Sequence, residues 1–329
     1  MSEPFFSIII PVKAINDYIR ETVSHILKLK DNDWELVIVP NEDSPSEWSD
    51  PRIRMISSGR VGPGAKRDLA AQSSRGEVLV FLDDDSYPQH DLLNVGRTLF
   101  QDPRVAALGG PAVTPPEDDF WQKVSGTVFL SRFSGGSPER YVPLGTVHEV
   151  EDWPSVNLMV RKTDFLGVGG FNCEYWPGED TKLCLQLVKT GKKILYSPDL
   201  VVWHHRRAGL GAHLKQVGAY GLHRGFFAKR FPDTSLKVGY IIPSLFLFFC
   251  IFSVTFSAME MPSPLKIMVI AGWGVYAAAL TKAFFDFVRH VSPPIAVTAI
   301  AYTFFTHMVY GFQFLRGFIF TRNLVSQLR

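Results

Sequence analysis

The chain has 329 residues, of which 46% are hydrophobic and 13% aromatic, and its formal net charge is +2 at pH 7. A charge so close to zero argues against a nucleic-acid-binding protein, for which a strongly basic domain is expected. The three cysteines, at positions 173, 184 and 250, match no zinc or disulfide framework and indicate a reducing compartment. The first residues lack the basic region and the cleavage site of a secretory signal, and strand-like sequence begins at once, so no signal is expected.

The first part of the chain predicts strands that alternate with helices. Strands are expected at residues 6–12, 35–39 and 53–56, because these runs are short and rich in Ile and Val. Between the first two, an apolar helical face begins after Asn16, which can cap it. Strand, helix and strand in this order form a βαβ unit with a right-handed crossover. A glycine-rich stretch then leads into a helix expected from Ala65 to Ser74.

Three consecutive aspartates, Asp83, Asp84 and Asp85, follow the apolar run 77–82, which predicts a buried strand of a mostly parallel sheet. In open α/β sheets the ligand lies beyond the carboxyl ends of the strands. Three like charges there repel one another unless a cation lies among them, and Mn²⁺ or Mg²⁺ binds carboxylate oxygens while keeping sites open for phosphate. We therefore expect a divalent ion at this strand end; a solvated acidic turn is the alternative.

Two basic residues, Lys66 and Arg67, stand in the first turn of the expected helix at 65–74. The glycine-rich stretch before them matches neither the P-loop nor the dinucleotide-binding fingerprint. A pyrophosphate at this turn would nevertheless meet cationic side chains and helix N–H groups together. A solvated basic turn is the other interpretation.

The order of these motifs resembles that of membrane-bound family 2 glycosyltransferases of the kind that build bacterial exopolysaccharides and other cell-surface glycans. The likeness covers roughly residues 5–230, and it begins with Ile-Ile-Ile-Pro-Val at 8–12, Gly-Ala-Lys-Arg-Asp-Leu-Ala at 64–70 and Phe-Leu-Asp-Asp-Asp at 81–85. It continues through Gly109-Gly110, 156–161, Gly-Gly-Phe at 169–171, Gly-Glu-Asp at 178–180, 189–194 and His204. The resemblance implies the A-type glycosyltransferase fold, a Rossmann-like domain with a mostly parallel sheet.

The resemblance also implies a donor site and a metal site. The residues implied at the nucleotide-sugar donor are Pro11, Val12, Asp43, Lys66, Arg67, Asp83 and Asp84. Those implied at the metal are Asp83, Asp85 and His204, although which aspartate binds the ion directly is left open. The loop at 40–44 departs from the acidic loop usual in the family, so Glu42 and Asp43 both stay candidates for contacting the base.

A catalytic carboxylate is expected at the start of the helix that follows Gly178. Glu179 and Asp180 lie in its first turn, where they could simply complement the helix dipole, an effect worth about 0.3–1 kcal/mol. The resemblance instead implies that Asp180 is the general base for the acceptor hydroxyl and that Glu179 orients the acceptor or the base. Trp153 and Asn157 are expected, with Glu179, at the acceptor. A single in-line displacement would invert the anomeric carbon.

Three apolar runs, 238–257, 267–285 and 295–314, are each long enough to span a bilayer. Basic residues before the first run indicate the cytosolic side. A third span would place the arginines that follow it outside, so its course is left open. Residues 212–231 have the composition of an amphipathic helix on anionic lipid, with a solvated basic face as the alternative.

We therefore expect a catalytic domain at 1–210, an amphipathic interfacial region at 211–237 and a membrane domain of two to three transmembrane helices at 238–329. The expected protein is an inverting hexosyltransferase of a bacterial-type inner (plasma) membrane, multi-pass, with a cytosolic catalytic domain. It would move one sugar from a nucleotide-diphosphate sugar to a hydroxyl of a polyprenyl-diphosphate-linked saccharide in cell-surface polysaccharide assembly. A polyprenyl-phosphate glycosyltransferase is the alternative. A sugar-phosphate nucleotidyltransferase and a non-enzymatic membrane adaptor match fewer of the motifs.

Overall fold

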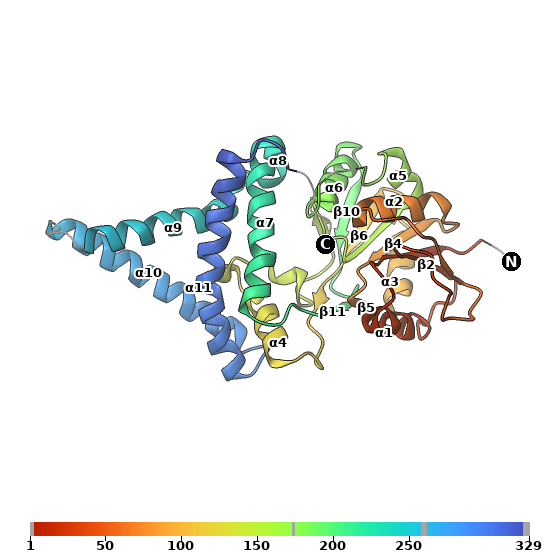
Figure 1. Cartoon of the computed structure of the whole chain (residues 1–329), viewed down its shortest axis with the longest axis horizontal. Coiled ribbons are helices and arrows are strands. Elements are labelled where there is room, and N and C mark those ends of the chain that lie inside the picture. Colours follow the sequence, from red (N-terminus) through yellow and green to blue (C-terminus); the bar gives the residue numbers. More distant parts are fainter. Residues whose placement is uncertain (1–2, 173–174, 258–261, 325–329) are drawn as a thin grey trace. The chain divides into compact units, whose positions relative to one another are not determined.

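The structure is a computed structural model that describes residues 3–172, 175–257 and 262–324 (Figure 1). Its contacts divide it into two compact units. The first unit consists of described residues up to 115 together with residues 142–205, and the second consists of residues 116–141 and 206–324. Residues 116–141 thus group with the C-terminal helices, although they lie far from them in the sequence.

The first unit is built on an eight-stranded sheet with the order β3-β2-β1-β4-β9-β6-β10-β8. Its strands are β1 (Phe6–Pro11), β2 (Trp34–Val39), β3 (Ile53–Met55), β4 (Val78–Leu82), β6 (Val105–Gly109), β8 (His148–Val150), β9 (Asn157–Arg161) and β10 (Lys193–Tyr196). Strands β1 to β4 pair in parallel, whereas β9 runs antiparallel between β4 and β6. The expected buried, mostly parallel sheet is confirmed, and β1, β2 and β4 are buried along their whole length.

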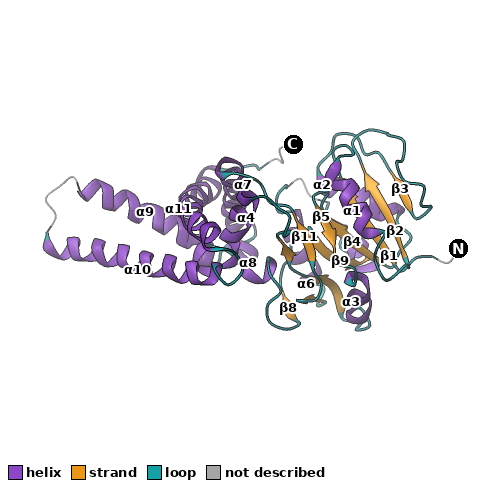
Figure 2. Cartoon of the chain, turned by 90° about the horizontal axis from the view of Figure 1, so that it is seen from below, coloured by secondary structure: helices purple, strands orange, loops and turns teal. Residues whose placement is uncertain are grey.

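Helices cover both faces of this sheet (Figure 2). They are α1 (Asp17–Ile26), α2 (Pro63–Ser73), α3 (Leu92–Leu99), α5 (Lys162–Gly167) and α6 (Glu179–Lys189). Along β1 the side chains alternate between two cores: Ile8 and Ile10 pack with α1 and α3, and Ile9 packs with α2, α5 and α6. Helix α2 begins at Pro63, two residues earlier than expected, because proline is well suited to the first turn of a helix.

A second, three-stranded sheet lies beside the aspartate motif. It consists of β5 (Ser86–Pro88), β11 (Val202–His204) and β7 (Ala112–Val113) in the order β5-β11-β7. Strand β11 pairs antiparallel with β5, so that His204 lies opposite Ser86, the residue directly after the three aspartates. This pairing joins two chain segments that are more than a hundred residues apart and positions the candidate site.

The second unit is helical. It contains α4 (Phe120–Thr127), α7 (Leu210–Arg230), the short α8 (Pro232–Ser235), α9 (Val238–Ser257), α10 (Ser263–Phe287) and α11 (Pro293–Leu315), followed by a π-helical turn, η4 (Arg316–Phe320). Three segments, Val238–Thr255, Ser263–Phe287 and Pro293–Phe320, are long and apolar enough to cross a membrane by length and composition. The apolar runs expected from the sequence are therefore helices.

Glycines let α7 and α11 approach closely. A Cβ added at Gly221 would lie 2.7 Å from the carbonyl oxygen of Tyr310, and one added at Gly225 would lie 2.0 Å from that of Phe314. Small residues at a helix–helix contact let the two backbones approach closely. The two helices therefore form one tightly packed pair.

Replacing Gly225 with alanine should lower the melting temperature of the detergent-solubilised protein. The new methyl group would overlap the α11 backbone, and overpacking of this kind costs about 1–3 kcal/mol. Gly211, on the same helix, has nothing within 4 Å of an added Cβ. Gly211→Ala should therefore leave the melting temperature unchanged or raise it, since alanine is favoured over glycine in helices by about 1 kcal/mol. Equal shifts for the two variants would contradict this packing.

Candidate active site

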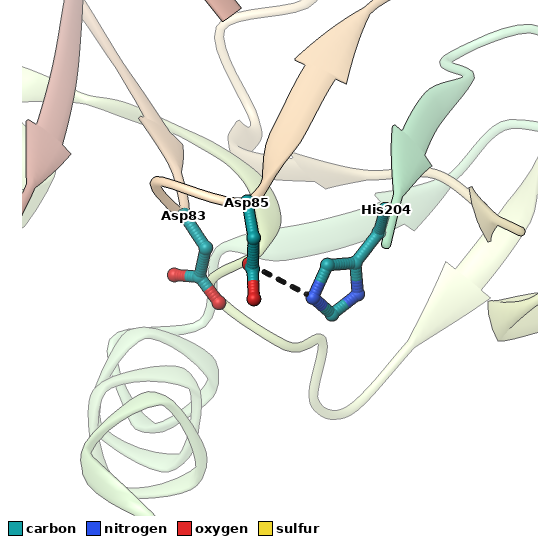
Figure 3. A group of neighbouring side chains, drawn as sticks. All are labelled: Asp83, Asp85 and His204. Atoms are coloured by element: carbon teal, nitrogen blue, oxygen red, sulfur yellow. Dashed lines mark ion pairs between the residues drawn. The ribbon is translucent and has the colours of Figure 1, made fainter. Parts of the chain in front are cut away.

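The three aspartates form a tight turn between β4 and β5. The backbone N–H of Asp83 donates to Ser86 Oγ over 3.1 Å, and the backbone N–H of Ser86 donates to the carbonyl oxygen of Asp83 over 3.2 Å. After the turn, the N–H of His205 donates to the carbonyl oxygen of Asp85 over 3.0 Å. Together with the β5–β11 pairing, these bonds hold His204 next to Asp85, with His204 Nε2 3.1 Å from Asp85 Oδ1 (Figure 3).

Asp83, Asp85 and His204 each direct one ligand atom into a group whose members lie within 4.8 Å of one another (Figure 3). The side chain of Asp85 is 9% exposed and that of His204 is 13% exposed, so the group is partly shielded from water. Two carboxylates and an imidazole fit Mn²⁺ well, whereas Mg²⁺ prefers a shell of oxygen atoms alone. The structure thus brings together the three residues expected at the metal.

Asp84, the middle aspartate, has a different partner. Asn16 donates from Nδ2 to Asp84 Oδ2 over 3.3 Å, while its Oδ1 accepts from the backbone N–H of Ile19 and caps α1. The cap at Asn16 was expected from the sequence, but its second contact was not. Asn16 therefore links the start of α1 to the aspartate turn.

Lys66 is buried at the carboxyl ends of β1 and β2. Its ammonium group donates to the carbonyl oxygens of Val12 and Val39, over 2.7 and 3.1 Å, and to Asn41 Oδ1 over 2.7 Å. Burial lowers the pKa of Lys66 to about 8, and the Asp84 carboxylate opposes that shift. With three protein acceptors already bound, Lys66 holds the two strand ends together, which is a role the sequence did not indicate.

Replacing Lys66 with methionine should lower the melting temperature. The buried carbonyl oxygen of Val12 would lose the donor that Lys66 supplies, and an unsatisfied group of this kind costs about 1–3 kcal/mol. The carbonyl oxygen of Val39 would keep its bond from the N–H of Val12. Lys28→Met is the matched control, because Lys28 is exposed on the surface of the same unit. Equal melting temperatures for the two variants would mean that the ammonium of Lys66 does not hold the strand ends together.

Arg67 is the link between the aspartate turn and α6. The residue is 2% exposed, and its guanidinium bonds to Asp83 Oδ1 at 2.5 Å and to Glu179 Oε1 at 3.2 Å. Nε of Arg67 has no hydrogen-bond partner within the described chain. A charge-assisted pair to two carboxylates fixes the planar guanidinium group in one orientation. The strand tip and the first turn of α6 therefore share one buried cation.

The next residue on α2, Asp68, holds the turn at 170–172 in place. Its carboxylate accepts the backbone N–H groups of Phe171 and Asn172, over 2.8 and 2.9 Å. Burial raises the pKa of Asp68, although these two bonds oppose the shift. Lys66, Arg67 and Asp68 thus connect α2 to the ends of β1 and β2, to β4 and α6, and to the turn at 170–172.

Helix α6 presents both expected carboxylates at its N-terminus. Glu179 is 4% exposed, and burial, together with the neighbouring Asp180, raises its pKa, while Arg67 opposes the rise. Asp180 is only partly buried, and its Oδ2 accepts the backbone N–H of Ser155 over 3.2 Å. Asp180 is therefore the more accessible of the two carboxylates, next to one that Arg67 ties to the aspartate turn.

The two side chains expected at the acceptor, Trp153 and Asn157, are buried. Trp153 is 2% exposed and donates from Nε1 to the carbonyl oxygen of Gly110 over 2.9 Å. Asn157 is 1% exposed and donates from Nδ2 to the carbonyl oxygen of Leu200 over 2.7 Å. Both side chains hold neighbouring backbone segments in place, and a contact with the acceptor stays a prediction.

The residues expected at the nucleoside differ in burial: two are buried and one is exposed. Pro11 and Val12 are buried at the end of β1, and Val12 supplies one of the carbonyl oxygens bound by Lys66. Asp43 is exposed in the loop after β2, next to Glu42, whose carboxylate lies 3.6 Å from Arg60. Their roles towards a nucleotide stay predictions.

Part of the chain matches a known protein family. Residues 7–154 match the model of the family described as Glycosyl transferase family 2. The pre-mycofactocin glycosyltransferase of Mycobacterium tuberculosis is 28% identical over 172 residues, which are 52% of this chain and 36% of that protein. A Methanococcus voltae protein, named dolichyl N-acetyl-alpha-D-glucosaminyl phosphate 3-beta-D-2,3-diacetamido-2,3-dideoxy-beta-D-glucuronosyltransferase, is 21% identical over 165 residues, 48% of this chain and 50% of that protein. The chain thus spans about a third to a half of the length of these curated relatives.

Among solved structures, a mannosyltransferase from Pyrobaculum calidifontis, in complex with GDP-Man and Mn²⁺, superimposes with a TM-score of 0.53. The two sequences are 16% identical, and the match covers 98% of this chain and 89% of the other. This likeness is one of fold, and it agrees with the A-type glycosyltransferase fold expected from the motifs. Residues 7–154 therefore match glycosyl transferase family 2, and the described fold is similar to that of a solved glycosyltransferase.

Proposed function

We propose that the first unit transfers one sugar from a nucleotide-diphosphate sugar to a hydroxyl group of a lipid-linked saccharide. The observation that supports this most strongly is the pair of bonds from Arg67 to Asp83 and Glu179. Because Glu179 is next to Asp180 in the chain, these bonds support one shared site for the candidate metal group and the candidate base, Asp180. A donor bound at the strand ends and an acceptor next to α6 would then be close enough to react.

Asp83, Asp85 and His204 would hold a divalent ion, for which Mn²⁺ fits the mixed oxygen and nitrogen donors better than Mg²⁺. Such an ion, when bound, supplies Lewis-acid stabilisation of the charge that develops on the leaving nucleoside diphosphate. Asp83 would meet the donor with its charge partly balanced by Arg67, and Asp85 and His204 lie close enough to bind one ion together.

Asp180 would take the proton from the attacking hydroxyl group. Its partial burial and its bond to the N–H of Ser155 orient the carboxylate. Glu179, which is bound to Arg67, would stay in place and orient Asp180 or the acceptor. General-base catalysis of this type raises the reaction rate roughly 10²–10⁴-fold. A single displacement at the anomeric carbon would invert its configuration.

A lipid-linked acceptor is supported by two observations. The Methanococcus voltae relative is named for a substrate that carries a sugar phosphate on dolichol. The second unit of this chain contains three helices with the length and composition of membrane spans. We further propose a plasma-membrane protein of bacterial type with its catalytic unit on the cytosolic side, acting in cell-surface polysaccharide assembly. A polyprenyl-phosphate acceptor is the second candidate.

Melting-temperature shifts of the full chain in detergent test the donor half of this proposal. A panel of nucleoside diphosphates, each with and without Mn²⁺, should include one base that stabilises the protein only when Mn²⁺ is present. At a ligand concentration of 100 times Kd the expected stabilisation is about 2.7 kcal/mol. The matching nucleotide sugar should be hydrolysed slowly in the absence of acceptor. If no nucleotide shifts the melting temperature and none is hydrolysed, the proposed function is wrong.

A further inference from the structure

Helices α7 and α11 run side by side and in the same direction. His213 Nε2 lies 2.8 Å from Thr306 Oγ1 near the start of the contact, and Lys229 Nζ donates to the carbonyl oxygen of Thr321 over 2.6 Å near its end. Between these two points, the backbone approaches at Gly221 and Gly225 follow in the same order. The two helices are therefore in contact over most of the length of α7 (Figure 1).

Helix α7 is too polar to lie within the hydrocarbon layer. It carries four basic residues, Lys215, Arg224, Lys229 and Arg230, and two histidines, His213 and His223. Charged side chains at the centre of a bilayer are costly. If α11 crossed the bilayer, its parallel partner would have to cross with it. The composition of α7 thus argues against a spanning α11, even though α11 is apolar enough to span.

Helices α9 and α10 form a hairpin whose far end extends away from the α7–α11 pair, while the hydroxyl of Tyr276, near the middle of α10, lies 3.1 Å from Nδ1 of His307 on α11. In Figure 1 the pair lies across the direction of α9, and in the perpendicular view of Figure 2 the pair is seen nearly end-on while the hairpin still runs across the picture. Helix α11 meets α9 near its beginning: Ser244 donates to the carbonyl oxygen of Gly311 over 3.0 Å. At 1.5 Å per residue, this contact lies only about 9 Å from the start of α9 at Val238.

The two ends of α11 lie on the same side of the hairpin. Its N-terminus follows α10 after a five-residue connection, from Val288 to Ser292, where the hairpin has returned to the side from which α9 left. Its C-terminal end lies at Lys229, which precedes α9 by fewer than ten residues. A helix that begins and ends on one side of a two-helix hairpin does not cross the same layer as that hairpin.

The exposed side chains of α11 and α10 also suggest that the two helices lie differently in the membrane. Helix α11 exposes an apolar stripe at Val297, Phe305 and Phe312, spaced eight and seven residues apart on one face. Helix α10 is more widely exposed: only 6% of its apolar window is buried, compared with 39% for the window of α11. One apolar face towards lipid, with the opposite face packed on protein, is typical of a helix in the plane of the interface.

We propose that, among the described helices, only α9 and α10 cross the bilayer, and that α11 lies in the plane of the interface beside α7, with Val297, Phe305 and Phe312 facing lipid. The α7–α11 pair is then a platform on the surface of the membrane. The chain after α11, with Arg316 and Arg322, is on the same side as the catalytic unit, which agrees with the positive-inside rule. This inference does not depend on the proposed function.

Spin labels on single cysteines measure the depth of each position in lipid vesicles. Labels at Val297→Cys, Phe305→Cys and Phe312→Cys should report one common depth, because an in-plane helix keeps its face at a constant level. Labels at Ile267→Cys, Val275→Cys and Phe285→Cys on α10 are the matched control, and Val275 should be the deepest of the three. All six positions are exposed, so labels there do not disturb packing. A depth maximum at Phe305, with shallow values at Val297 and Phe312, would overturn the proposal.

Accessibility from the two sides of the membrane is an independent test on the full-length protein in intact cells. An impermeant maleimide should label Ser263→Cys, at the start of α10, without permeabilisation. It should label Ser292→Cys and Asn323→Cys, which flank α11, only after permeabilisation. The wild-type protein with its three native cysteines gives the background. Labelling of Asn323→Cys in intact cells, with Ser292→Cys still protected, would mean that α11 spans and that the proposal is wrong.

Discussion

Asp85→Asn should reduce the transfer rate at least 10²-fold and should remove the Mn²⁺-dependent part of the melting-temperature shift caused by the nucleotide. Asp85 is buried and shares the candidate metal group with Asp83 and His204. Asparagine keeps the size of the side chain but removes the charge, so it weakens the attraction for a divalent ion. Lewis-acid stabilisation is worth several kcal/mol, which corresponds to a loss of two or more powers of ten.

The measurement is the dependence of activity on Mn²⁺ concentration. The half-saturating Mn²⁺ concentration should rise in Asp85→Asn, while the secondary structure measured by circular dichroism stays unchanged. Asp91→Asn serves as the matched control, because Asp91 is on the surface of the same unit and pairs with Lys30. An unchanged half-saturating concentration together with wild-type activity in Asp85→Asn would exclude Asp85 from the metal group.

The sheet could be predicted from the sequence because its strands carry local signals. Short runs of Ile, Val and Leu, bounded by Gly or Pro, are typical of buried strands, and β1, β2 and β4 lie where these runs predict them. The start of α6 at Glu179 was equally visible, since Gly178 precedes two acidic residues and an apolar helical face. Each of these features depends only on neighbours in the chain.

Contacts between distant segments could not be predicted in this way. The hydrogen-bond partners of the Lys66 ammonium include carbonyl oxygens at two different strand ends, and their position depends on how those strands pair. The burial of Trp153 likewise depends on Gly109, where a Cβ would lie 2.2 Å from the indole ring. The three-residue strands that bring His204 to Asp85 are too short to give a periodic signal. His204 was found only through the resemblance to a family.

Hydropathy alone does not distinguish a spanning α11 from one that lies in the plane of the interface. The apolar content of Pro293–Phe320 predicts a span as readily as that of the helix before it. The proposal that the two helices differ rests on the partner helix of α11, α7, whose basic residues would have to enter the bilayer with it. The grouping of residues 116–141 with these helices is of the same kind, because it rests on long-range contacts such as that of Ser131 Oγ with Asp286 Oδ2, at 2.8 Å.

Asp180→Asn should lower the transfer rate by roughly 10²–10⁴-fold if the acceptor is a hydroxyl group. Asparagine has the size of aspartate but cannot take a proton from the acceptor. Because Glu179, and not Asp180, is bound to Arg67, the donor side of the site should be undisturbed. The Mn²⁺-dependent melting-temperature shift with the nucleotide should therefore equal that of the wild type, which separates this variant from Asp85→Asn.

The same variant distinguishes the two acceptor classes. A phosphate monoester, whose second pKa is about 6, reaches the site already ionised and needs no base. Asp180→Asn with activity close to wild type, and with donor binding intact, would therefore favour polyprenyl phosphate over a saccharide hydroxyl. The pH dependence gives a second criterion: transfer to a hydroxyl should lose the acidic limb of its rate profile in the variant, since that limb reports protonation of the base. The acceptor thus follows from one substitution measured in two ways, with Asp91→Asn again as the control.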